Sequence, residues 1–130
     1  MKENVMLTIA SLLSILLLTL HLMDDIILGM APGGVSNMTA VLVLVVWLYG
    51  TLVLAGRRSG YVIILLGSII GAGIPILHMT GKGLGAGRST GAYFFVWTLL
   101  ALGVTAIFSV ILSVRGLWSL RKGQARKPVD

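Results

Sequence analysis

The chain has 130 residues, of which 57% are hydrophobic and only 11% are charged. A soluble domain carries about 25% charged residues, so this composition excludes an ordinary water-soluble globular protein. No cysteine is present, which excludes disulfides, thiolate metal sites and cysteine nucleophiles. The net charge of +6 arises from ten Lys and Arg against four Asp and Glu, and these charges are confined to a few points of the chain.

Four apolar runs lie between the charged points, over residues 5–23, 39–55, 61–79 and 92–114. Each is close to the ~20 residues that a helix needs to cross a ~30 Å hydrocarbon core. The runs are continuous rather than alternating, which favours helices over a closed barrel. The sequence therefore predicts an all-α integral membrane protein, with residues 1–130 as one domain of four transmembrane helices in a small bundle. We expect the first run to stay uncleaved, because it is longer than the ~7–15 residues of a signal peptide core.

The basic residues are unevenly divided between the connections of these helices. Two of the ten, Lys82 and Arg88, fall between the third and fourth runs. The other eight fall at the chain ends and between the second and third runs: Lys2, Arg57, Arg58, Arg115, Arg121, Lys122, Arg126 and Lys127. This positive-inside bias predicts both termini in the cytoplasm, in a bacterial or archaeal cytoplasmic (inner) membrane. The basic tail, 115–130, is then a topology determinant beside anionic lipid, and we expect no nucleic-acid partner.

Small residues recur four positions apart on two of the predicted helices. They are Gly67 and Gly71 on the third helix, and Ala101, Thr105, Ser109 and Ser113 on the fourth. In lipid such stripes let helices approach closely, so we expect them at packing faces. Pro75 has no amide proton and is predicted to kink the third helix. Aromatic residues near the predicted membrane surfaces favour interface belts: Tyr93 and Trp97 outside, Tyr61 and Trp118 inside.

Two histidines and two aspartates lie toward the outer end of the bundle. His21 is the seventeenth residue of the first run and His78 the eighteenth of the third, so both are at nearly one depth. Asp24 and Asp25 follow His21 by three and four positions, which places them on the same helix face. We therefore predict an outward-facing cluster of His21, Asp24, Asp25 and His78. Ionisable groups inside a membrane span are costly and tend to mark ion, proton or ligand sites.

Several chemistries fit these residue types. Two His with one or two Asp suit a transition metal such as Zn²⁺ or Fe²⁺, and His with Met suits copper, with Met23 and Met79 as additional ligands. Two histidines from two helices also suit axial ligation of haem. A His–Asp pair can instead pass protons without any metal. A lipid or quinone pocket and a purely structural role also remain open, the latter with aspartates paired to Lys82 or Arg88.

The same features leave more than one class of protein open. The chain offers no catalytic motif or oxyanion device, which disfavours an enzyme. An accessory subunit of a larger membrane complex would dock through the small-residue stripe of the fourth helix. A small-solute or ion transporter of this size would need to form a homo-oligomer, because four short helices make only part of a carrier.

Overall fold

The computed structural model describes residues 2–27, 29, 35–80 and 90–125. They form four helices: α1 (Lys2–Ile27), α2 (Val35–Leu52), α3 (Arg58–Thr80) and α4 (Thr90–Ala125). No strand occurs among these described residues. The all-helical fold with four helices is thus as predicted.

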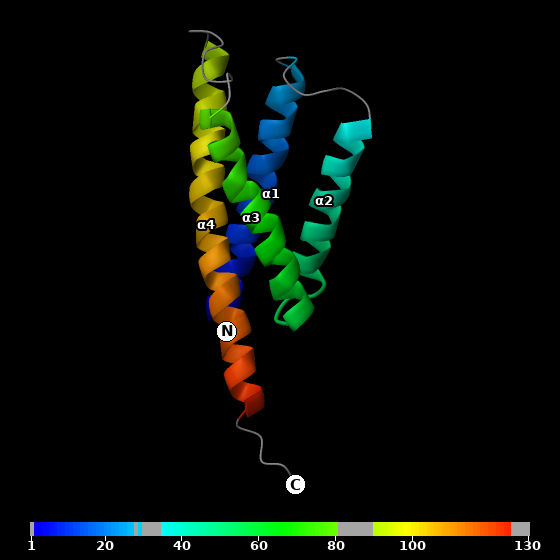
Figure 1. Ribbon diagram of the computed structural model, residues 1–130, viewed down its shortest axis with the longest axis vertical. Coiled ribbons are helices and arrows are strands. Elements are labelled where there is room, and N and C mark those ends of the chain that lie inside the picture. The colour runs from blue at the N-terminus through cyan, green and yellow to red at the C-terminus, as the bar shows by residue number, and fades with distance from the viewer. Residues whose placement is uncertain (1, 28, 30–34, 81–89, 126–130) are drawn as a thin grey trace.

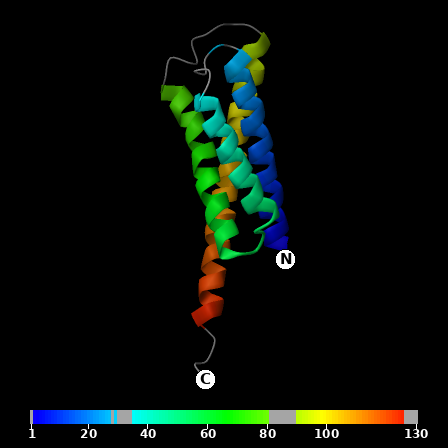
Figure 2. The ribbon, with the colours of Figure 1, turned by 90° about the vertical axis from the view of Figure 1, so that its right-hand side faces the viewer.

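The helices follow one another around a small bundle (Figure 1). Each packs against its neighbours in sequence, and α1 closes the ring by packing along α4. Across the diagonals, α1 touches α3, whereas the described residues of α2 and α4 make no close contact. The start of α1, the α2–α3 turn and the end of α4 lie toward one end of the bundle, and the end of α1, the start of α2, the end of α3 and the start of α4 lie toward the other (Figure 2).

Three helices are long and apolar enough to cross a membrane: α1, the Arg58–His78 part of α3 and the Tyr93–Gly123 part of α4. The apolar segment described in α2, Met38–Leu52, is shorter. α2 ends three residues before the predicted limit, because the chain turns at Gly56, whose φ of +75° favours glycine. α4 instead continues to Ala125, so the predicted tail begins as helix. At ~1.5 Å per residue its 36 residues extend ~54 Å.

The surface of the bundle is apolar, while part of its interior is polar. Large hydrophobic side chains are exposed on every helix, and eight serine, threonine and histidine residues are buried: Ser11, Ser14, His21, Thr51, Ser68, Thr98, Ser109 and Ser113. The exposed hydroxyls of Thr8 and Thr19 donate to the carbonyls of Asn4 and Ile15 within α1, at 2.9 and 2.8 Å. These two hydroxyls therefore need no water molecule as a hydrogen-bond acceptor. Of the buried hydroxyls, those of Ser68 and Ser113 have no hydrogen-bond partner within the part of the chain that the structure describes, and the others are paired. An apolar exterior around a partly polar interior is the distribution that lipid favours.

Glycines on α3 let two neighbouring helices approach closely. Trp47 of α2 is 1% exposed and its indole covers Gly67, where an added Cβ would overlap the ring. Gly71 faces Ala106 and Leu102 of α4. Both glycines thus lie at interfaces inside the bundle.

The small-residue stripe of α4 also faces the interior. Ser109 and Ser113 are fully buried, and Thr105 accepts a hydrogen bond from Ser14 of α1. α3 is helical on both sides of Pro75, whose ring lies against Gly103 of α4. The stripe is occupied by packing within the chain.

Of the four aromatic residues predicted to form interface belts, three are exposed and one is buried. Tyr93, Trp97 and Trp118 are exposed, in keeping with interface positions. Tyr61 is 6% exposed; its hydroxyl donates to Asn4 Oδ1 and its ring lies over Gly116. Tyr61 is thus buried, because Gly116 leaves space for its ring between α3 and α4, and its place in an interface belt stays a prediction.

Candidate metal or proton site

His21 and Asp25 of α1 meet His78 of α3 near the C-terminal ends of these two helices. His21 Nε2 lies 3.7 Å from Asp25 Oδ2, and His78 Nε2 lies 3.7 Å from Asp25 Oδ1. Each of the three residues offers one possible metal-binding atom, a ring nitrogen or a carboxylate oxygen, and these three atoms lie within 4.8 Å of one another. Asp25 therefore bridges the two imidazoles, with one oxygen toward each. We call these three residues the histidine cluster.

The periodicity of α1 places two members of the cluster together. The buried face of α1 recurs every three or four residues: Leu7, Ala10, Ser11, Ser14, Leu18 and His21. Asp25 is the next position on this face, one turn beyond His21, and its side chain is 14% exposed. His78 reaches the same point from α3 across a diagonal of the bundle, where α1 and α3 touch. The cluster thus depends on the α1–α3 contact.

Phe95 of α4 closes a third side of the cluster. Its ring centroid is 4.7 Å from that of His21 and 5.4 Å from that of His78, and it is 4% exposed. The two histidine rings are 4.8 Å apart at an interplanar angle of 81°. Axial haem ligation needs two imidazoles on opposite faces of a porphyrin. Direct edge-to-face contact leaves no space for one, so this geometry does not favour haem.

Three polar atoms of the cluster are buried without hydrogen bonds. Both ring nitrogens of His21 and Asp25 Oδ1 lack a partner, as does Asp24 Oδ2 beside them. Each unpaired buried group costs roughly 1–3 kcal/mol. Native proteins rarely accept that cost, and such atoms indicate an ion, a shared proton or an ordered water.

The hydrogen bond of His78 determines how its second nitrogen can act. Nδ1 lies 3.0 Å from the carbonyl oxygen of Ile74, which can only accept, so Nδ1 carries a proton. Nε2 then presents either a lone pair or a second N–H to Asp25. A lone pair facing a carboxylate requires a cation between them, either a proton or a metal ion. Metal-binding histidines commonly donate their other N–H to a backbone carbonyl in this way.

The structure does not bring all of the predicted site residues together. Asp24 lies next to the cluster but outside the three-residue group. Met23 is 56% exposed and lies on the opposite side of α1 from His21, because two residues turn a helix by about 200°. The side chain of Met79, and all of Lys82 and Arg88, lie outside the described residues. Sequence reasoning missed Phe95, whose only signal is its place on the α4 face shared with buried Leu99 and Leu102.

A second buried polar group lies further along the bundle, and its hydrogen bonds are complete. Trp47 Nε1 donates to Ser11 Oγ at 2.9 Å, Ser11 pairs with Thr51 Oγ1 at 2.7 Å, and Thr51 donates to the Trp47 carbonyl at 2.8 Å. Ser14 Oγ lies 3.1 Å from Thr105 Oγ1, which donates to Ala101 O. We call Ser11, Ser14, Trp47, Thr51 and Thr105 the hydroxyl layer. Leu18 separates it from His21 along the buried face of α1.

The described fold and cluster define an all-helical chain with an apolar surface and a buried two-histidine, one-carboxylate group. Comparisons of the chain with protein-family models, curated proteins and solved structures found no match. The geometry of the site is therefore the basis for a functional proposal.

Proposed function

We propose that this chain is a small polytopic membrane protein whose histidine cluster binds a divalent transition-metal ion of the zinc type. The observation that carries the proposal is that neither ring nitrogen of fully buried His21 has a hydrogen-bond partner among the described residues. His21 Nε2 faces Asp25 Oδ2 at 3.7 Å, and the unpartnered Asp25 Oδ1 faces His78 Nε2 at the same distance. A metal ion would bind Nε2 of His21 together with Asp25, and Nδ1 of His21 would then carry the imidazole proton. His78 would supply the third ligand through Nε2, with its ring held by the Ile74 carbonyl.

The donor set favours zinc over the other metals considered. Two imidazoles and a carboxylate, with a fourth position for water or Asp24, match tetrahedral zinc coordination. Ligand atoms around such an ion stand roughly 3.3 Å apart. The two 3.7 Å separations are close to that value, and the 4.8 Å spread requires a contraction of about 1.5 Å. Copper with methionine has no support from Met23, which is exposed on another side of α1.

A shared proton is the second candidate. Both Nε2 atoms lie 3.7 Å from Asp25, and a proton held between carboxylate and imidazole would require these separations to shorten to about 2.7–3.2 Å. The two candidates differ in their need for metal. In the first, the cluster requires an ion of defined stoichiometry; in the second, it acts without one.

The membrane placement is part of the proposal. The apolar exterior supports insertion, and the described basic residues gathered toward one end of the bundle support a cytoplasmic location for both chain ends. An accessory subunit remains an alternative, although the stripe of α4 on which it rested is packed inside the chain. A dimeric transporter also remains an alternative, with the histidine cluster as its ion site.

Equilibrium dialysis of the detergent-purified, metal-free protein against Zn²⁺ tests the proposal. We expect one zinc per chain for the wild type and none for His21→Ala/His78→Ala. Ser14→Ala, a buried change on the same face of α1, serves as the control and should retain zinc. Equal zinc content in the wild type and the double variant would contradict the metal proposal and leave the proton as the candidate.

A further inference from the structure

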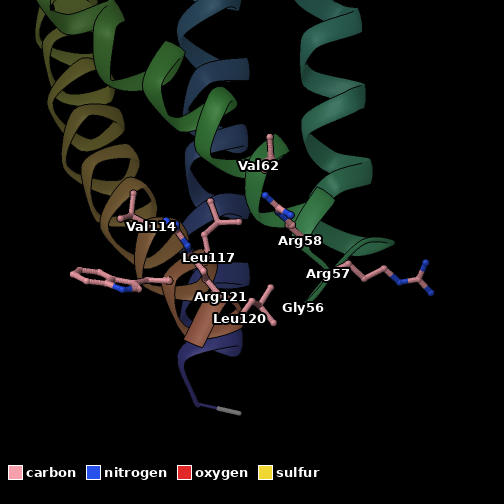
Figure 3. A pocket seen from close by; sticks show the side chains of 9 residues that line it. Gly56, Arg57, Arg58, Val62, Val114, Leu117, Leu120 and Arg121 are labelled. Carbon is pink, nitrogen blue, oxygen red and sulfur yellow. The ribbon is translucent and has the colours of Figure 1, made fainter. Parts of the chain in front are cut away.

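A cavity of about 1050 Å³ lies at the other end of the bundle, between the α2–α3 turn and the C-terminal half of α4 (Figure 3). Arg57 and Arg58 line it from the turn and the start of α3, and Arg121 lines it from α4. Apolar side chains, including Val62, Val114 and Leu117, make up the adjoining walls. Figure 3 shows the side chain of Arg57 extending away from the other labelled side chains, so we focus on Arg58 and Arg121 among the three lining arginines.

The arginines of this cavity have no carboxylate partner among the described residues. No acidic residue lines the cavity. The described acid nearest in the fold, Glu3, pairs with Arg115 at 2.7 Å, and Asp24 and Asp25 belong to the far end of α1. Like charges in one cavity repel, so an anion that entered it would be attracted to both arginines.

The chemistry of the lining identifies the kind of anion. The planar guanidinium group matches phosphate, to which it donates two parallel hydrogen bonds. Val62 follows Arg58 by one helical turn and Val114 precedes Arg121 by two, so both apolar walls extend toward the middle of the bundle. A ligand that suited both parts would carry a phosphate and a hydrocarbon chain. Basic pockets at the cytoplasmic ends of transmembrane helices bind anionic lipid headgroups.

Trp118 supports a position at the membrane surface. It lines the cavity and is 62% exposed, and Lys122 Nζ lies 5.2 Å from its ring centroid. Tryptophan and lysine side chains of this kind anchor helices at the headgroup level. The cavity thus lies where the apolar surface of the bundle meets its basic end.

We propose that this cavity binds the phosphate of an anionic phospholipid, with Arg58 and Arg121 on the headgroup and an acyl chain along Val62 and Val114. The proposal shares the membrane placement with the proposed function and does not depend on the histidine cluster. Free phosphate has the same chemistry at the arginines, and the apolar walls favour the lipid.

Quenching of Trp118 fluorescence by brominated lipids tests the assignment. In a Trp97→Phe background, Trp118 is the exposed tryptophan, because Trp47 is 1% exposed. The protein is reconstituted with phosphatidylglycerol or phosphatidylcholine that carries brominated chains. We expect phosphatidylglycerol to bind more tightly, with a loss of about 5-fold for each arginine changed to glutamine. Arg115→Gln, which removes a basic charge at the same end outside the cavity, should retain the preference.

Four outcomes would overturn the proposal. Equal quenching by the two lipids would show no headgroup selection, and a full preference in Arg58→Gln/Arg121→Gln would place the selection elsewhere. Loss of the preference in Arg115→Gln as well would indicate general charge attraction. Displacement of brominated phosphatidylglycerol by millimolar inorganic phosphate would indicate a site for the free ion. Arg58→Lys/Arg121→Lys, which keeps the charge, should keep part of the preference, and far-UV circular dichroism checks that each variant is helical.

Discussion

Two groups of buried polar side chains lie along the same face of α1, and they differ in how completely their atoms are paired. In the hydroxyl layer, the Trp47 indole, Ser11 and Thr51 form a closed circuit that returns to the Trp47 carbonyl. In the histidine cluster, one turn beyond Leu18, both nitrogens of His21 and Oδ1 of Asp25 are left without hydrogen bonds. Both groups are largely buried, but the polar atoms of the hydroxyl layer are hydrogen-bonded and several of those in the histidine cluster are not.

This difference separates a structural role from a binding role. A fully paired hydroxyl group stabilises helix contacts in lipid and needs nothing further. An unpaired imidazole next to an unpaired carboxylate is stable only if something else completes it. We therefore propose a ligand for the histidine cluster and none for the hydroxyl layer. Changes in the cluster should alter binding, whereas changes in the layer should alter only stability.

The largest effect is expected from removing either histidine. His21→Ala and His78→Ala should each lower zinc affinity by at least ~100-fold, because each deletes one of three ligands and leaves Asp25 with a single imidazole. Isothermal titration of the metal-free proteins measures the affinities. If either variant binds zinc as tightly as the wild type, the histidines do not share one site.

Asp25→Asn should have the next largest effect. The amide keeps the shape of the carboxylate but loses the charge that faces both Nε2 atoms, and zinc affinity should fall by about 10–100-fold. Glu3→Gln is the matched control, since it neutralises another carboxylate of α1 that pairs with Arg115. Competition with a zinc-sensitive dye distinguishes the two. Equal losses in both variants would point to net charge rather than coordination.

Gly67→Ala should destabilise the bundle without a comparable effect on the metal. The added Cβ overlaps the Trp47 indole, and the cost of such overpacking is about 1–3 kcal/mol. Gly73→Ala is the matched control, because a Cβ there meets no atom within 4 Å. Thermal unfolding in detergent micelles, followed by circular dichroism, compares the two. A Gly67→Ala protein as stable as Gly73→Ala would contradict the packing described for α2 on α3.

Thr51→Val should have the smallest effect. The change keeps the shape of the side chain and opens the hydroxyl circuit, while Ser11 still accepts from Trp47. Interhelical hydrogen bonds in membranes contribute about 0.6 kcal/mol on average, so the unfolding free energy should fall by roughly that amount. Zinc affinity, measured by the same dye competition, should be unchanged. A large loss of zinc binding here would remove the distinction between the two polar groups.

The sequence predicted the parts of this structure that depend on one helix at a time. The helical class follows from continuous apolar runs, and the relation of His21 to Asp25 follows from the period of the helix. The common depth of His21 and His78 follows from counting along two helices in the same direction. These features need no knowledge of how the helices are rotated or ordered.

The remaining features depend on how the helices meet. Phe95 reaches both histidines only because α4 packs against α1 and α3, which no local pattern in the sequence specifies. Tyr61 is buried because Gly116, more than fifty residues later, leaves space for its ring. The hydroxyl circuit similarly joins α1 to α2. Of the layer, Thr105 was named from the sequence, as a member of the small-residue stripe of α4.

The most direct test of the metal proposal is ¹⁵N NMR of the histidine side chains, with and without one equivalent of Zn²⁺. The chain contains only two histidines, so His78→Ala assigns the spectrum. We expect Nδ1 of His78 to carry a proton throughout, and zinc to shift the Nε2 resonances of His21 and His78 together. A shared metal site would be contradicted if the Nε2 chemical shifts did not change on addition of zinc, or if the shift of only one histidine changed.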